Sequence, residues 1–197
     1  MPTIRKPTRA QLAAFIQNQQ VILAFEQLFD AANSGGPSLL SATTADSTAI
    51  ANTTAPTKFS QTFIVPAGTL IPGEPLRFTM QALFSTTGSP TAQLRVLLGS
   101  TAILDTAAGL GLEASVTNHG ITSQGTITCR ASGTSGSVVA SLTGLIGLGG
   151  SRIEVISTAP VTIDTTVDQA LSLEWTWSAA SPSNTIKLQQ LLVEAMN

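Results

Sequence analysis

The stretch Leu171–Ser178, LSLEWTWS, alternates strictly between apolar and polar residues. In an extended chain, successive side chains point to opposite faces, so one face would carry Leu171, Leu173, Trp175 and Trp177. The other face would carry the serines, the glutamate and the threonine. Strict alternation of this kind is typical of an antiparallel strand that buries one face and exposes the other. We therefore predict a β-rich domain with both tryptophans in its core.

The same alternation continues along most of the chain. Further runs with a period of two occur at 76–84, 94–98, 126–130 and 185–196, separated by turns rich in Gly, Pro, Ser and Asn. No crossover helix is predicted between them, and parallel pairing would need such crossovers. Residues 58–197 are therefore predicted to form a mainly β, antiparallel jelly-roll-like β-sandwich of about eight to ten strands. An immunoglobulin-like sandwich is the alternative. The alternation slips near Gln189-Gln190, which predicts a β-bulge there.

The N-terminal stretch Thr8–Asn33 is the one long segment with helical spacing. Thr8 is suited to cap the first turn, and Ser34-Gly35-Gly36-Pro37 ends the pattern. We predict that residues 1–33 form an extended arm and an anchoring or oligomerisation helix. Its apolar residues include Leu12, Phe15, Ile16, Ile22, Phe25, Leu28 and Phe29.

The stretch 34–57 is polar and has little periodicity. It is predicted to be a linker between the helix and the sandwich, or a partly ordered strap. Since the sandwich can form its own core without the helix, the apolar face of the helix is predicted to pack on other chains.

Composition favours a protein that works in an assembly. Of the 197 residues, 43% are hydrophobic and only 10% are charged, against about 25% charged residues in an average soluble protein. A surface so poor in charge suits a molecule whose neighbours cover much of it. The alternative is a neutral, Thr-rich β domain that acts alone.

Charge and hydropathy exclude several partners. The net charge is −2, and Arg5, Lys6 and Arg9 make the one basic cluster. Nucleic-acid binding needs more phosphate neutralisation than this, so none is expected. The longest apolar run, Val21–Phe25, is too short to span a bilayer. The N-terminus has no apolar region typical of a signal peptide, which predicts synthesis in the cytoplasm and no membrane partner.

Residues suited to catalysis are scarce. His119 is the single histidine and Cys129 the single cysteine, a combination that excludes nearly all zinc sites. Neither belongs to a nucleophile motif, and Cys129 alternates with polar residues as a buried small residue would. The GLGLEA stretch at 109–114 matches a dinucleotide fingerprint only formally, since no helical pattern follows it. We predict a protein that is not an enzyme and needs no cofactor.

Two weaker ligand sites can be considered. Asp164 and Asp168 could contribute to a Ca²⁺ loop, but they lack a third acidic neighbour, which favours a solvated turn. Trp175 and Trp177 could contact a sugar ring if their face were exposed. They share that face with two leucines, so burial in the core is favoured.

Three stretches carry a family resemblance. Residues 15–33, FIQNQQVILAFEQLFDAAN, resemble the leading segment of tailed-bacteriophage structural proteins. Residues 99–106, GSTAILDT, and 170–196, ALSLEWTWSAASPSNTIKLQQLLVEAM, resemble jelly-roll modules of phage fibres and head-decoration proteins. The resemblance implies a virion component, commonly a trimer, with a short N-terminal anchor, an outward sandwich and no catalytic residues.

The predicted function is accordingly that of a non-enzymatic virion protein. It would be a trimeric capsid decoration (cement) protein or a short head fibre, with residues 1–33 contacting other copies and other virion proteins. The alternative is a tail-fibre or adhesin-type module that recognises a host surface glycan.

Overall fold

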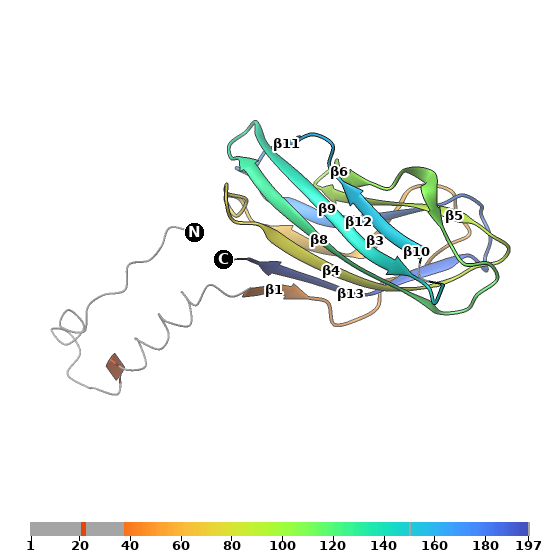
Figure 1. The fold of residues 1–197 in the computed structure, drawn as a ribbon. Helices are drawn as coiled ribbons and strands as arrows, with labels where there is room; N and C mark the ends of the chain where they lie inside the picture. Colours follow the sequence, from red (N-terminus) through yellow and green to blue (C-terminus); the bar gives the residue numbers. More distant parts are fainter. Residues whose placement is uncertain (1–20, 23–37, 150, 197) are drawn as a thin grey trace.

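A computed structural model describes residues 21–22, 38–149 and 151–196 (Figure 1). Two antiparallel sheets pack face to face. Sheet A contains β1 (Ser38–Ala42), β2 (Ile50–Ala51), β4 (Leu76–Ser85), β8 (His119–Ala131), β9 (Gly136–Ile146), β10 (Ser151–Ile156), β11 (Val161–Ile163) and β13 (Thr185–Ala195). Sheet B contains β3 (Thr57–Val65), β5 (Thr91–Leu98), β6 (Thr101–Asp105), β7 (Leu110–Gly111) and β12 (Gln169–Trp177), and the 3₁₀ turn η1 (Ala107–Gly109) precedes β7.

Sheet A has the order β1-β13-β4-β8-β9-β10, with β2 also paired to β13 and β11 to β9. Sheet B has the order β3-β12-β5-β6, with β7 paired to β5. Every pairing among the described strands is antiparallel. The prediction of a mainly β, antiparallel sandwich is confirmed.

The core lies between the two sheets. All four apolar residues of Leu171–Trp177 face it and are at most 1% exposed. The rings of Trp175 and Trp177 meet edge to face, with centroids 5.4 Å apart at 74°, an arrangement that aromatic pairs favour. Core burial of both tryptophans is therefore confirmed.

The bulge predicted near Gln189-Gln190 is present. The register of β13 against β4 shifts between Leu188 and Gln190. On the other edge of β13, Thr43 and Ser47 form hydrogen bonds to the β13 backbone on both sides of this bulge, with their own backbone and hydroxyl groups. The Ser47 amide donates to the Leu188 carbonyl at 2.7 Å, and Ser47 Oγ accepts from the Leu188 amide at 2.9 Å. Thr43 makes the same reciprocal pair with Leu191, at 3.1 and 2.9 Å.

These bonds change the role predicted for residues 34–57. From Ser38 onward the stretch belongs to the sandwich, because it supplies β1 and β2 and places Ile50 in the core at 5% exposure. The indole N–H of Trp177 donates to the Ile50 carbonyl at 3.2 Å. We call residues 38–56 the strap. Hydroxyl groups of Ser47 and Thr43 hold it against β13. For this reason its sequence can lack the alternation of apolar residues that is typical of strands. The sandwich begins at Ser38 rather than at Lys58.

We expect Ser47→Ala to lower the free energy of unfolding by about 1–3 kcal/mol, because it leaves the Leu188 amide without an acceptor. Urea unfolding followed by tryptophan fluorescence measures the change. Thr54→Ala, at an exposed position of the same strap, is the control and should stay within about 0.5 kcal/mol of wild type. Equal stability of both variants would contradict the role given to Ser47.

Only a small part of the predicted N-terminal helix falls within the described residues. Val21 and Ile22 are helical there, and Ile22 is 1% exposed without belonging to the core cluster of the sandwich. The other predicted anchor residues lie outside the described residues: Leu12, Phe15, Ile16, Phe25, Leu28 and Phe29. In the part of the chain that the structure describes, no helix is long and apolar enough to cross a membrane.

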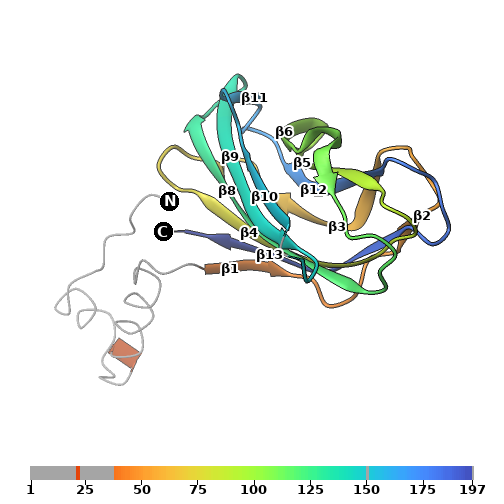
Figure 2. The ribbon, with the colours of Figure 1, turned by 45° about the vertical axis from the view of Figure 1, so that its right-hand side comes forward.

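The sandwich has two distinct ends. At one end, the base, Ser38 of β1 pairs with Ala195 of β13, so the chain enters and leaves the described sandwich side by side. The loops at 66–75, 99–100, 132–135 and 164–168 also lie at the base. The opposite end, the crown, carries the loops at 52–56, 86–90, 112–118, 147–149 and 178–184 (Figure 2).

Candidate functional site

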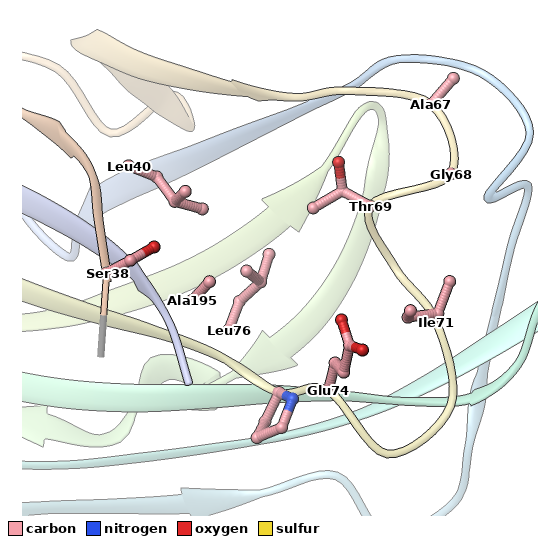
Figure 3. A pocket seen from close by; sticks show the side chains of 10 residues that line it. Ser38, Leu40, Ala67, Gly68, Thr69, Ile71, Glu74, Leu76 and Ala195 are labelled. Carbon is pink, nitrogen blue, oxygen red and sulfur yellow. The ribbon is translucent and has the colours of Figure 1, made fainter. Parts of the chain in front are cut away.

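A cavity of about 280 Å³ opens at the base (Figure 3). It lies between β1, the loop after β3 and the end of β13. Leu40, Thr69 and Leu76 extend toward the same space from three separate segments. The walls are mainly apolar, with the carboxylate of Glu74 beside them. The lining residues are Ser38, Leu40, Ala67, Gly68, Thr69, Ile71, Glu74, Pro75, Leu76 and Ala195.

One wall of this cavity is the 66–75 loop, which a neighbouring loop holds in place. Gly68 has a φ of +74°, a conformation that suits glycine. The Gly68 amide donates to the Thr165 carbonyl at 2.9 Å, and the Ala67 amide donates to Asp168 Oδ1 at 2.8 Å. The cavity therefore has walls fixed by hydrogen bonds between two base loops.

Asp164 and Asp168, which were considered as ligands of a Ca²⁺ ion, both accept hydrogen bonds from nearby residues of the protein. Asp168 braces the cavity loop, as described above. Asp164 accepts from the Thr166 hydroxyl at 2.6 Å and from the Thr166 amide at 2.8 Å, and these bonds lower the pKa of its carboxyl. Both aspartates thus act as turn-forming residues, in line with the turn interpretation.

At the crown, hydrogen bonds link the loops into one continuous surface. Thr86 and Asn184 are the buried polar residues at its centre, 6% and 1% exposed. The Thr86 amide donates to the Val116 carbonyl at 2.9 Å, and Asn184 Oδ1 accepts from the Thr87 amide at 2.8 Å. The Asn52 amide joins the strap to the 178–184 loop by donating to a carbonyl at 3.1 Å. The crown loops are therefore held in one arrangement.

The crown also concentrates backbone strain. Asn52, Ser115 and Asn118 have positive φ values of 51°, 54° and 54°, and Ala107, the first residue of η1, has 49°. Outside glycine such values cost free energy and tend to cluster where a protein binds something. Together with the fixed loops, this makes the crown a second candidate surface.

Glu113 is the charged residue that braces one corner of the crown. Its carboxylate pairs with His119 Nδ1 and accepts from the Gly149 amide in the β9–β10 turn. The His119 bond is the main cause, and the Gly149 bond the second, of a lowered pKa for Glu113. Leu148, at the tip of the braced turn, is 89% exposed. His119 therefore lies in a structural pair at the start of β8.

The lowered pKa of Glu113 predicts a pH-dependent contribution to stability. Because folding favours the ionised carboxylate, the contribution is complete above the ordinary glutamate pKa of 4.5 and is lost as the pH falls through the lowered folded value. We expect Glu113→Gln to melt below wild type at pH 7, with a difference that shrinks steadily below pH 4.5. Thermal melts from pH 7 to pH 2.5 test this. Glu154→Gln, at an exposed position on β10, is the control and should show no such convergence.

The remaining candidate residues lie in the core. Cys129 is 2% exposed, and burial raises the pKa of its thiol, so it is the small buried residue that the sequence predicted. Trp175 and Trp177 are buried and offer no surface to a ligand. The base cavity and the crown were not predicted, since their residues come from loops far apart in the sequence.

A second hollow, about 360 Å³, lies between the outer strands β6 and β10. Ser157 joins the two sheets there. Its Oγ accepts from the Ala140 amide at 2.9 Å and donates to the Ile103 carbonyl at 3.0 Å. The polar groups of this hollow thus hold sheet A against sheet B.

Comparison with known proteins leaves the family open. No family model matches the chain, and no curated protein matches it. Among solved structures, the metal-free lectin I-B4 of Griffonia simplicifolia is similar over 70% of this chain and 78% of the lectin chain, with 6% sequence identity and a TM-score of 0.39. At this TM-score the likeness carries no argument about function.

Proposed function

We propose that the protein is a non-enzymatic virion component of a tailed bacteriophage, either a trimeric capsid decoration (cement) protein or a short head fibre. Residues 1–33 would attach it to other copies and to other virion proteins. The sequence resemblance of residues 15–33 and 170–196 and the low content of charge, 10% of residues, support this proposal.

The observation that carries the proposal is that the N-terminal segment joins the sandwich at one end, the base, opposite the crown. Ser38 enters at the base beside Ala195, so everything that precedes Ser38 is connected to one end of the molecule. The crown lies at the other end. An attachment segment at the base would therefore leave the crown facing away from the particle.

We propose that the sandwich is of jelly-roll type, because it consists of two antiparallel sheets built from many short strands. The chain crosses between the sheets: after β4 it forms β5, β6 and β7, and it returns to sheet A in β8.

Replacing two anchor residues tests the attachment. We expect Ile22→Asp combined with Phe25→Asp to abolish incorporation into particles, because buried carboxylates would prevent the apolar face from packing. Quantitative mass spectrometry of purified particles measures the copy number. Val167→Asp, at an exposed base position (48% exposed), is the control. Wild-type copy number in the double variant would refute attachment through residues 1–33.

The fixed crown favours a second candidate function, recognition of a host surface glycan by a tail-fibre or adhesin-type module. Its strained positions Asn52, Ser115 and Asn118 support it, whereas the buried tryptophans remove the stacking surface considered from the sequence. Binding on a glycan array that Asn118→Gly weakens at unchanged stability would support this function. An array without signal for the folded protein would refute it.

A further inference from the structure

We propose that the outer edge of β10 is a contact site for β10 of a second copy of this chain. The two sandwiches would join across a two-fold axis, and their two A sheets would form one continuous antiparallel sheet. This inference goes beyond the proposed function, because that function uses residues 1–33 for attachment and assigns no role to this edge.

Among the described strands that end a sheet, β10 has the most regular pairing. The two sheet paths end in β1 and β10 and in β3 and β6. The pairings of β1, β3 and β6 each contain a register shift, whereas β10 pairs with β9 from Ser151 to Ile156 without one. Bulges are one means by which proteins keep an edge from accepting another strand. The edge of β10 lacks this protection.

The space beside β10 is open. The strand lies at the outer side of sheet A, and no described strand pairs with its second edge (Figure 2). The hollow of about 360 Å³ between β6 and β10 borders this edge at Val155 and Ile156. The backbone N–H and C=O groups of β10 that point away from β9 therefore form a template for one further strand.

Arg152 and Glu154 are the charged residues of β10, and both are exposed. In their own chain they lie opposite Leu145 and Thr143 of β9. Neither of them belongs to an ion pair of the described residues. The edge thus carries one positive and one negative side chain that have no charged partner on the neighbouring strand.

Elsewhere in the two sheets, arginine and glutamate residues that are register partners do form ion pairs. Arg77 on β4 faces Glu194 on β13, and its Nε lies 2.9 Å from Glu194 Oε2. Arg95 on β5 faces Glu174 on β12, and these two side chains also pair. A second copy would supply the two charged residues of β10 with partners of the same kind.

The two charges select the register of the contact. In an antiparallel pair across a two-fold axis, positions equally far from the axis lie opposite each other. With the axis at Ile153, Arg152 of each copy lies opposite Glu154 of the other, which gives two ion pairs. With the axis at Arg152 or at Glu154, two like charges would lie opposite each other, an arrangement that is destabilising. We therefore place the axis at Ile153.

Exposed apolar side chains flank this edge. Leu145, Leu148 and Ile156 are all exposed, and they lie on β9, in the β9–β10 turn and at the end of β10. With the axis at Ile153, the β9–β10 turn of one copy lies next to the end of β10 of the other. Removal of part of this apolar surface from water would favour the contact.

The contact is small, because β10 has only 6 residues. It would bury less than the area of about 1,200 Å² that is the lower limit for stable complexes. We therefore expect it to form where the chain is concentrated, as on the surface of a particle, and to dissociate at the dilution of a gel-filtration run.

Sedimentation equilibrium of the full chain tests the contact in the form with Ile22→Asp and Phe25→Asp, which removes the proposed N-terminal assembly. We expect the molar mass at about 1 mM chain to be about twice that at about 20 µM. Adding Arg152→Glu should abolish this increase, because two carboxylates then lie opposite each other. Adding Glu154→Arg as well should restore it. Arg130→Glu, at an exposed position of β8, is the control and should keep the increase.

Hydrogen exchange locates the contact within the sandwich. At the higher concentration, we expect backbone amides of β10 to exchange more slowly, because those at its outer edge become hydrogen-bonded to the second copy. The amides of β1, at the opposite edge of sheet A, should exchange at an unchanged rate.

Four results would overturn the proposal: a mass that does not change with concentration, an increase that persists with Arg152→Glu, no recovery on adding Glu154→Arg, and a mass that rises well beyond twofold. The last would indicate head-to-tail pairing rather than a two-fold contact. These outcomes are separate from the proposed function. The change of mass with concentration reports on β10, whereas the incorporation into particles reports on residues 1–33.

Discussion

Trp177→Ala is expected to lower the free energy of unfolding by about 3–5 kcal/mol, the usual cost of removing a large buried aromatic side chain. The ring is 1% exposed and packs edge to face on Trp175. Its loss also leaves the Ile50 carbonyl without the indole donor, which loosens the strap. Urea unfolding measured by far-UV circular dichroism gives the value.

Trp177→Phe is the matched control, because it keeps an aromatic ring and removes the donor and part of the volume. Its loss should be clearly smaller than that of Trp177→Ala. If Trp177→Ala cost less than about 1 kcal/mol, the side chain would not be a core residue.

Gly125→Val is expected to prevent folding to a soluble protein. Gly125 on β8 faces the core opposite Phe78 on β4. A Cβ atom at Gly125 would lie 2.2 Å from Phe78 Cζ and 2.7 Å from the carbonyl oxygen of Ser141 on β9. Because one obstacle is the backbone of the neighbouring strand, a change of side-chain rotamer cannot relieve the clash.

Solubility on expression and the thermal melt of any soluble fraction test the effect of Gly125→Val. Gly120→Ala is the control on the same strand, since a Cβ at Gly120 meets nothing within 4 Å. It should behave like wild type. A Gly125→Val protein that melts within a few degrees of wild type would contradict the packing of Phe78 over Gly125.

The period-two strands could be predicted from the sequence because burial of one face leaves a local pattern. In Leu171–Trp177 each apolar residue of the pattern lies in the core, as predicted. The polar face is not exposed as predicted, however, because Ser172 and Glu174 are only 1% and 9% exposed. The bulge at Leu188–Gln190 was also predicted, since an extra residue shifts the alternation. The burial of Cys129 was predicted in the same way, because the residue alternates with polar neighbours and therefore faces inward.

The pairing of the strap with β13 could not be predicted, because it depends on hydroxyl bonds rather than on apolar spacing. Thr43 and Ser47 look like linker residues until the bulged edge of β13 is placed beside them. The same holds for the crown, where Thr86 and Asn184 connect loops that are distant in sequence. Polar residues that satisfy a distant backbone leave no periodic signal.

The base cavity and the crown could be recognised only once the arrangement of the strands was known. Leu40 and Ile71 line one cavity because β1 lies beside β13, and the loop after β3 reaches the same end. The local sequence around Leu40 and Ile71 contains no feature that distinguishes them from other apolar residues near turns. By contrast, the apolar row of Phe15, Ile22 and Phe29 was predicted from its spacing alone, and of this row only Ile22 lies within the described residues.

The most direct test of attachment through residues 8–33 is the molar mass of the full chain in solution, measured by light scattering during gel filtration. We expect a trimer for wild type, three times the chain mass of 20.2 kDa. We expect a folded monomer for Ile22→Asp combined with Phe25→Asp. A monomeric wild type, or a double variant with the mass of wild type, would contradict it.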